Sequence, residues 1–405
     1  MNTRIDRIII YSVLFVCIVF NSCYALATVD SFNKVGYLLL AISILLMIFQ
    51  KAEKHSSKSK TSRGFLIVIL CFVAASIAVN FSYAAFANSI KFVLVVILAY
   101  LVSEMISFKS FLSVFFRAME WIAVFAIACW ILINIMHFTL PLPELENRNG
   151  IIYQVGIIVF QFVGAYQSYP AIGVFWEGGI FSSFLNLAIA FWAAGLVSAR
   201  KHDIILLVCA IIVSESTAGI LLIPLAFSPL LFRKTSRTQP IKLCLIIVAV
   251  ALIVLNYSQI VSFLNSVNPD LFSKLLYSDM ITTSTRIQSP SANMEIFLSA
   301  PLFGRGISGA GMEYASIALA STGIDSQTST STFLMAAFGL GGVIILFGWV
   351  YGIMQIRDLS VWQRMIILLV LIIILNKETH TVTLFLWCLF FYFLSKKDAV
   401  VHFEV

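Results

Sequence analysis

The sequence contains few charged residues, and this scarcity decides its class. Only 11% of the 405 residues are Asp, Glu, Lys or Arg, whereas 60% are hydrophobic. Soluble globular domains carry about 25% charged residues, so the composition excludes such a domain. Apolar runs of roughly 15 to 22 residues recur along the chain, which is typical of a helical protein that crosses a membrane many times. The net charge of +7 is therefore attributed to membrane topology, and no nucleic-acid partner is expected.

Several chemical motifs are also absent. The seven cysteines lie in apolar segments without a Cys-x-x-Cys pair, so neither a disulfide framework nor a metal site is indicated. No glycine-rich loop is followed by Lys-Ser or Lys-Thr, and no Asp-x-Asp pair stands in the predicted outer loops. These absences argue against ATP, a nucleotide-sugar donor and a catalytic metal. We therefore expect no cofactor, and a substrate that is already activated.

Lys and Arg in the short loops orient the predicted spans. The first helices are predicted over 8–27, 35–50, 64–80, 89–106 and 118–138, with a basic cytoplasmic loop at 51–63. The first of them also fits a cleavable signal peptide, although so many later spans favour an uncleaved helix. An outer loop over 139–175 follows, before helix six at 177–197. Its apolar run 151–165 is short for a span, so we predict a re-entrant or interfacial helix there.

Two later stretches are too long for one span and too short for two. One lies between Lys201 and Arg233 and the other between Arg364 and Lys396, and both are apolar with basic ends. Two full spans need roughly 40 residues, so each stretch is predicted to form two short helices that meet inside the membrane. The polar turns are expected at 214–219 and 376–381. Polar backbone at such depth is tolerated only beside water or inside protein, so both turns should face the outer side beneath a long loop.

These elements predict an all-α polytopic integral membrane protein, a single transmembrane domain over 1–405. About twelve transmembrane helices are expected, with both termini in the cytoplasm. One large outer loop, 257–331, separates helix nine at 240–256 from helix ten at 332–353. All but seven of the 26 Lys and Arg residues then fall on the cytoplasmic side; the seven are Lys34, Lys91, Arg148, Lys274, Arg286, Arg305 and Lys377.

The loop 257–331 is the candidate functional part, because it is polar in a chain that is otherwise apolar. Arg286 and Arg305 are its most informative residues, since a guanidinium binds phosphate oxygens bidentately and stays charged. Gly304 and Gly306 flank Arg305 and are predicted to leave backbone N–H groups open to an anion. The alternative is that both arginines pair with acidic residues and only fold the loop. The acidic residues considered are Asp279 and Glu295.

Five more ionisable residues fall on the outer side or in the intramembrane turns, where charge is unfavourable unless it serves a function. Glu177 opens helix six and is a candidate proton acceptor, although an acid at a helix N-terminus is also favoured by the macrodipole. Glu215 and His380 stand in the two turns and are either polar lining or proton-handling groups. Arg148 and Lys377 are candidate helpers in phosphate binding.

Four segments together resemble the O-antigen polymerase and O-antigen ligase-like superfamily, over roughly residues 170–350. They are Ile172-Gly-Val-Phe-Trp-Glu177-Gly-Gly, Ser216-Thr-Ala-Gly219, Thr285-Arg286 through Pro301-Leu-Phe-Gly304-Arg-Gly306, and Thr330-Ser-Thr-Phe333 through Phe338-Gly-Leu-Gly-Gly342. Gly178 stands where the family usually has proline, and Thr217 and Ala171 stand where it often has arginine. The loop also lacks the histidine that is typical of ligases before helix ten. These departures favour a polymerase over a ligase.

The resemblance implies a glycosyltransferase of the bacterial inner membrane, with its active site facing the periplasm. Such an enzyme transfers a growing glycan from an undecaprenyl-pyrophosphate carrier to the sugar of a second lipid-linked repeat, without a metal, in O-antigen and lipopolysaccharide biosynthesis. The implied partners are the undecaprenyl-pyrophosphate-linked oligosaccharide, membrane lipids and a chain-length regulator. Arg286 and Arg305 are expected to bind the diphosphate, with Arg148 or Lys377, and Glu177 to act as base. The alternatives are ligation of finished polymer to a lipid A core and transport of lipid-linked glycan.

Overall fold

The computed structural model describes residues 59–138, 142–146, 152–155, 160–163, 170–232, 279–322 and 327–395, with isolated positions before 46 and between 241 and 266. Within these ranges the protein is mostly helical and has one small sheet. Three helical stretches are long and apolar enough to cross a membrane: α3 (Lys60–Val79), α4 (Tyr83–Met105), and α5 (Phe108–Trp130) with its π-helical continuation η2 (Ile131–Ile135). The expectation of a helical, membrane-embedded protein is confirmed to this extent.

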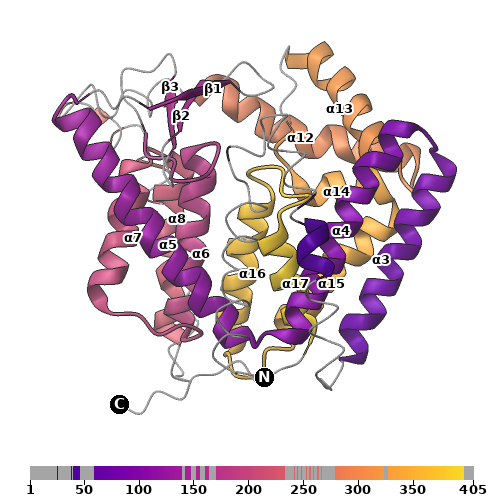
Figure 1. Cartoon of the computed structure of the whole chain (residues 1–405), viewed down its shortest axis with the longest axis horizontal. Helices are drawn as coiled ribbons and strands as arrows, with labels where there is room; N and C mark the ends of the chain where they lie inside the picture. Colours follow the sequence, from indigo (N-terminus) through magenta and orange to yellow (C-terminus); the bar gives the residue numbers. More distant parts are fainter. Residues whose placement is uncertain are drawn as a thin grey trace.

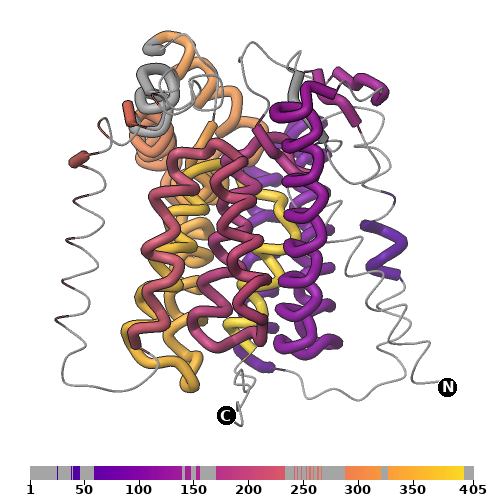
Figure 2. The backbone as a smooth tube through the Cα atoms, turned by 90° about the vertical axis from the view of Figure 1, so that its left-hand side faces the viewer, coloured from indigo at the N-terminus to yellow at the C-terminus, as the bar shows by residue number. Residues whose placement is uncertain are grey.

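Short links join α3 to α4 and α4 to α5, and these three helices run antiparallel to their neighbours (Figure 1). Ser82 and Ser107 are the N-cap residues of α4 and α5, and their hydroxyls accept the N–H groups of residues 85 and 110. The remaining helices are α6 (Gly178–Ala194), α7 (Lys201–Val213), α8 (Thr217–Phe227), η3 (Ser228–Phe232), α12 (Asp279–Ser299), α13 (Gly306–Thr322), α14 (Thr330–Phe338), α15 (Leu340–Met354), α16 (Val361–Leu375) and α17 (Leu384–Leu394). Figures 1 and 2 show the sheet, α12 and α13 together at one end of the molecule. We call this the sheet end, and the other the opposite end.

Both predicted pairs of short helices are present, while the position of their turns inside a membrane stays a prediction. α7 and α8 meet at a turn over 214–216, and α16 and α17 are joined by a turn over 376–383. α16 and α17 have 15 and 11 residues. At 1.5 Å per residue they extend about 22 Å and 16 Å, less than the roughly 30 Å of a hydrocarbon core. The predicted helix 332–353 is broken at Gly339, whose φ of 59° ends α14 and starts α15.

The prediction of a helix over 151–165 is wrong in the described part of that segment. β2 (Ile152–Val155) pairs antiparallel with β1 (Glu144–Glu146) and β3 (Phe160–Val163). β-branched and aromatic residues favour strands, and a short apolar run does not reveal its period. Tyr153 is buried and its hydroxyl donates to Trp176 O at 3.1 Å, so the sheet lies against the chain that leads into α6.

An aromatic core fixes α17 at the centre of the molecule. Every residue of α17 is buried, as expected for a helix that is apolar on all sides. The ring of Phe385 stacks on Phe115 of α5 with centroids 4.0 Å apart. At the opposite end, the hydroxyl of Tyr392 donates to Val102 O and Ile106 O, at 3.3 Å and 3.2 Å. The 376–383 turn that precedes α17 is therefore held by a packed helix.

Several predicted features lie outside the described residues. These are most of the helices at 8–27, 35–50 and 240–256, the side chain of Arg148, and both chain termini. The count of twelve spans and the cytoplasmic placement of the termini therefore stay predictions.

Candidate functional site

Three distant segments of the chain meet at Lys377. This residue lies in the 376–383 turn and is only 6% exposed. Its Nζ donates to Gly179 O at 2.6 Å, in the first turn of α6, and to Ser216 Oγ at 3.1 Å, at the N-cap of α8. One buried ammonium thus joins two segments that precede it by 198 and 161 residues.

Glu177 brings a carboxylate to the same place. It is the N-cap residue of α6, has extended backbone angles, and is partly exposed. A Cβ added to Gly179 would lie 2.4 Å from Glu177 Oε1 and 2.9 Å from Lys377 Nζ. The ends of the Glu177 and Lys377 side chains therefore both lie beside the Cα of Gly179. We call Glu177, Gly179, Ser216 and Lys377 the Lys377 cluster.

Small residues allow the cluster to form, because α6 and the 214–216 turn approach each other through their backbones. A Cβ on Gly178 would lie 2.4 Å from Ser214 O, and one on Gly219 would lie 2.3 Å from Ser182 Oγ. Asn186 Nδ2 also donates to Gly219 O at 2.9 Å. Only residues without side chains permit this approach, which explains the glycines in two of the four motif-like segments.

Glu215 and His380 occupy the two turns, as the sequence predicts. Glu215 is 3% exposed and has a φ of 51°, directly before Ser216. His380 is 2% exposed; its backbone N–H donates to Thr330 Oγ1 at 2.6 Å, and its Nδ1 lies 3.3 Å from Thr383 Oγ1. The structure thus brings Glu177, Glu215 and Lys377 to one place, and the His380 ring packs edge to face against Phe184 of α6, with centroids 6.2 Å apart.

A layer of uncharged polar side chains joins the 376–383 turn to the long loop. Asn376 Oδ1 accepts from Ser329 Oγ at 2.7 Å and also from Ser331 Oγ. Gln327 Nε2 donates to Asn293 Oδ1 of α12 at 2.9 Å. Further bonds run from Asn293 Nδ2 to Thr332 Oγ1, from Thr330 Oγ1 to Glu378 O and from Thr379 Oγ1 to Gln327 O. The 376–383 turn thus contacts the described part of the predicted loop, whereas the placement of both turns on the outer side stays a prediction.

The uncharged members of these contacts were not predicted from the sequence. Gly179, Ser216, Asn293 and Asn376 were not candidate site residues. Asn293 had a visible signal, because it is an amide within the mostly apolar run 292–298, and it is fully buried. Buried amides are almost always hydrogen-bonded, so such a residue predicts a partner without identifying it.

Arg286 lies in α12, one turn before Ser289. Positions 286, 289 and 293 recur at the spacing of one helix face. Ser289 and Asn293 are fully buried, and Ser289 Oγ accepts from Thr328 N at 3.1 Å. Position 286 is therefore on the face of α12 that meets residues 327–332. The side chain of Arg286 lies outside the described part of the chain.

The 301–306 turn differs from its prediction. Gly304 has a φ of 66°, and a Cβ there would lie 2.4 Å from the backbone carbonyl carbon of Ala337. Its N–H donates to Ala300 O at 3.0 Å, and that of Arg305 donates to Ala336 O at 2.9 Å. The prediction that Gly304 leaves its N–H open to an anion is therefore wrong, because close backbone packing uses that group. Gly306, with a φ of 71°, begins α13.

Arg305 pairs with side chains that are close to it in the sequence. Its Nε lies 3.2 Å from Glu313 Oε2, and its Nη2 donates to Ser299 Oγ at 3.1 Å. Pairing with an acidic residue was one of the two predicted roles, although the partner is Glu313. Asn80 Nδ2 of the α3–α4 link donates to Gly304 O at 3.0 Å. Figure 1 shows α13 beside α3 and α4, whereas α6 and α8 lie across the molecule, so Arg305 does not join the Lys377 cluster.

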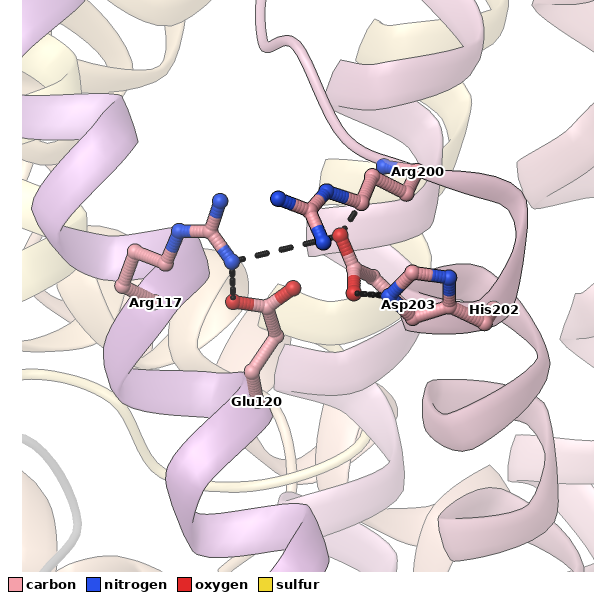
Figure 3. Close-up of polar contacts among 5 residues, drawn as sticks. All are labelled: Arg117, Glu120, Arg200, His202 and Asp203. Atoms are coloured by element: carbon pink, nitrogen blue, oxygen red, sulfur yellow. Dashed lines mark hydrogen bonds and ion pairs between the residues drawn. The ribbon is translucent and has the colours of Figure 1, made fainter.

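A second charged cluster lies at the opposite end (Figure 3). Arg117 Nη1 of α5 lies 2.6 Å from Glu120 Oε2 and 3.9 Å from Asp203 Oδ2 of α7. Asp203 also accepts from the backbone N–H of Arg200 at 2.9 Å and lies 3.0 Å from His202 Nε2. Burial raises the pKa of Asp203, but the Arg200 N–H and the neighbouring side chains outweigh it, so the net shift is downward. This Asp203 cluster fastens α5 to α7.

No protein-family model matches the chain, and the comparison with curated proteins gave no match either. In the described ranges, no group of three or more His, Cys, Asp and Glu side chains is placed to hold a metal ion.

Proposed function

We propose that the protein polymerises undecaprenyl-pyrophosphate-linked oligosaccharide repeats into O-antigen or a related surface polysaccharide. The proposal starts from the motif resemblance. It is supported by one observation above all, the hydrogen bonds of Lys377 Nζ to Gly179 O and Ser216 Oγ. These bonds bring two of the family-like motifs together, and the bond from Thr330 Oγ1 to Glu378 O brings a third to the same turn. Motifs that act in one reaction are expected to converge in this way.

The proposed orientation follows the distribution of basic residues. Along the described helices, lysines and arginines gather near the opposite end of the molecule. Those at this end are Lys60, Arg63, Lys109, Arg117, Arg200, Lys201, Arg357 and Arg364. Cytoplasmic loops carry the excess of basic residues in membrane proteins. We therefore assign the opposite end to the cytoplasm of a bacterial inner membrane and the sheet end to the periplasm, with about twelve spans in all.

The proposed reaction is a direct glycosyl transfer. The hydroxyl oxygen of the acceptor sugar attacks the anomeric carbon of the donor, and the bond between that carbon and the phosphate oxygen breaks. The lipid diphosphate leaves with the bonding electrons, while the hydroxyl proton passes to a base. Glu177 suits this last role because its carboxylate is partly exposed at a fixed helix start.

The leaving diphosphate needs positive charge, because negative charge grows on it as the bond breaks. Arg286 is the proposed principal contact, since position 286 is on the α12 face directed to residues 327–332. Arg305 and Arg148 are proposed as secondary contacts, and Gly306 as part of the turn that carries Arg305. Arginine supplies this charge in a fixed bidentate geometry, without a metal.

Elongation by the purified protein in lipid nanodiscs tests the proposal directly. Wild-type protein, given the lipid-linked repeat alone, should produce a ladder of longer glycans on a gel. Arg286→Ala should leave single repeats, because the leaving group loses its principal counter-charge. The matched control is Arg357→Ala, an exposed arginine at the opposite end, which should give the wild-type ladder.

Three other results would overturn parts of the proposal. A normal ladder from Arg286→Ala would remove the diphosphate role of that residue. Transfer of finished polymer to a lipid A core, without elongation, would indicate a ligase. Movement of the lipid-linked repeat between leaflets, without a new glycosidic bond, would indicate a transporter.

A further inference from the structure

Three consecutive residues with hydroxyl side chains bond to the chain around Lys377. They are Ser329, Thr330 and Ser331, at the start of α14. Ser329 Oγ donates to Asn376 Oδ1 at 2.7 Å, and Ser331 Oγ donates to the same oxygen. Asn376 is the C-cap residue of α16. The residue directly before Lys377 is therefore held by two hydroxyls.

Thr330 bonds to the chain on the other side of Lys377. Its Oγ1 donates to Glu378 O at 2.7 Å and accepts from the backbone N–H of His380 at 2.6 Å. Backbone groups in a turn need such partners, because a turn has no regular ladder of hydrogen bonds. One hydroxyl group, on a residue that is 2% exposed, thus serves two backbone groups of the turn. Side-chain bonds therefore fix the backbone both before and after Lys377.

The segment that carries these hydroxyls is itself bonded to α12. Ser289 Oγ accepts from Thr328 N at 3.1 Å, and Gln327 Nε2 donates to Asn293 Oδ1 at 2.9 Å. Ser289 and Asn293 are fully buried. The two residues directly before 329–331 are therefore anchored, so the hydroxyls act from a fixed position.

The side chain of Lys377 reaches two other segments of the chain from this fixed backbone. Its Nζ donates to Gly179 O in the first turn of α6 and to Ser216 Oγ at the N-cap of α8. The stem of lysine is long and flexible, so its ammonium takes fewer positions when the backbone beneath it is held.

We propose that residues 329–331 form a hydroxyl clamp, in which Thr330 is the positioning residue that directs the Lys377 ammonium to Gly179 O and Ser216 Oγ. The effect of the clamp on elongation rests on the proposed function, whereas its effect on the position of the ammonium does not.

Thr330→Val is the sharpest test, because it removes the hydroxyl and keeps a β-branched side chain. The probe is sulfo-NHS-acetate, which acetylates amines, applied to protein in phosphatidylcholine nanodiscs; mass spectrometry gives the rate at each lysine. The variant should label at Lys377 about tenfold faster than the wild type, a ratio that corresponds to about 1.4 kcal/mol. Thr330→Ser keeps the hydroxyl and should restore slow labelling. An unchanged rate at Lys377 in Thr330→Val would overturn the proposal.

Thr381→Val is the matched control. Thr381 lies in the same turn and is 5% exposed, and its Oγ1 has no hydrogen-bond partner among the described residues. Asp203→Asn controls for a general loss of stability, because it removes a contact between α5 and α7 at the opposite end. Both variants should label at Lys377 as the wild type does. A tenfold rise in either of them would overturn the specific role of Thr330.

Ser331→Ala replaces Thr330→Val if that variant does not fold. It removes one of the two bonds to Asn376 Oδ1, so the labelling rate at Lys377 should rise by a smaller factor. A wild-type rate in Ser331→Ala would then overturn the proposal.

Elongation separates this inference from the proposed function. In a protein that elongates, Thr330→Val should lower kcat about tenfold and leave KM for the lipid-linked donor unchanged, and Thr330→Ser should restore kcat. An unchanged kcat beside faster labelling would overturn the role of the clamp in elongation. If the wild-type protein elongates no repeat, the polymerase proposal fails, whereas the labelling of Lys377 still decides whether the clamp exists.

Discussion

Gly179 and Gly304 both stand in segments that resemble family motifs, yet different atoms fill the space beside them. At Gly179 the nearest atoms are the ends of the Glu177 and Lys377 side chains. At Gly304 they are the backbone carbonyl of Ala337, with both atoms at 2.4 Å. Side-chain ends move easily, whereas backbone moves only with the helix that contains it. The first glycine therefore makes room for two charged side chains, and the second joins two parts of the chain.

The same difference applies to the charges beside each glycine. Lys377 is buried and bonded to residues of two other segments. Arg305 has a side chain that is 40% exposed and pairs with Glu313, eight positions further along, whose side chain is 38% exposed. A sequence motif that contains glycine and arginine thus does not show which atoms lie against the glycine. Nor does it show which residue pairs with the arginine.

The largest expected effect is a loss of folded protein from Gly304→Ala, because the added methyl group would overlap with the backbone of Ala337. The φ of 66° alone disfavours alanine by about 1 to 2 kcal/mol, and the methyl group must also push α14 away. Natural proteins are stable by only about 5 to 15 kcal/mol. We expect Gly304→Ala to lose most of its folded protein, measured as the monodisperse peak in size-exclusion chromatography of a detergent extract.

Gly311→Ala in α13 is the control for this change, since open space surrounds the added Cβ. It should elute as the wild type. A wild-type peak and a wild-type Tm for Gly304→Ala would show that the 301–306 turn is a loose contact. Gly304 would then not differ from Gly179 in how firmly its neighbouring atoms are held.

An intermediate effect, on the elongation rate, is expected from Arg305→Ala. Its ion pair with Glu313 is half open to solvent, and such pairs contribute about 0 to 1 kcal/mol to stability. Arg305→Ala should therefore lower the Tm only slightly and still produce a glycan ladder, with a smaller loss of elongation rate than Arg286→Ala. Side-by-side rates of the two variants measure this difference. A loss for Arg305→Ala as large as that for Arg286→Ala would make the guanidinium a principal diphosphate contact.

The features predicted best from the sequence are those that depend on the thickness of a membrane. Apolar stretches with basic ends that are too short for two spans required the turns at 214–216 and 376–383, and the structure has both. Ionisable residues in apolar surroundings were also conspicuous, so Glu177, Glu215 and Lys377 were found individually.

What the sequence did not predict depends on partners far along the chain. Gly179 and Lys377 are 198 positions apart, and no spacing rule relates them. Gly304 meets Ala337 only because α14 ends at Gly339. The sheet at 144–163 was missed for another reason, since an apolar run of that length fits a strand pair as well as a short helix.

The smallest effect on elongation is expected at Asp203, which tests whether buried charge alone distinguishes the Lys377 cluster. The Asp203 cluster is charged and partly buried, but it joins only α5 and α7 at the opposite end (Figure 3). Asp203→Asn should lower stability by about 1.5 to 3 kcal/mol, the value of a hydrogen bond to a charged group, while elongation per folded molecule stays unchanged.

The pH dependence of this loss has a definite sign. The pKa of Asp203 is lowered from its usual 3.8 in the folded protein, because the Arg200 N–H and the neighbouring side chains outweigh burial. A lowered pKa gives stability that is present above the unfolded value and is lost as pH falls through the folded value. The Tm difference between wild type and Asp203→Asn should therefore be full at pH 7 and shrink below about pH 4. A difference that stays constant down to pH 3 would mean that the carboxylate charge does not fasten α5 to α7. An accompanying fall in elongation rate at pH 7 would mean that the two charged clusters are coupled through the molecule, contrary to the separation argued here.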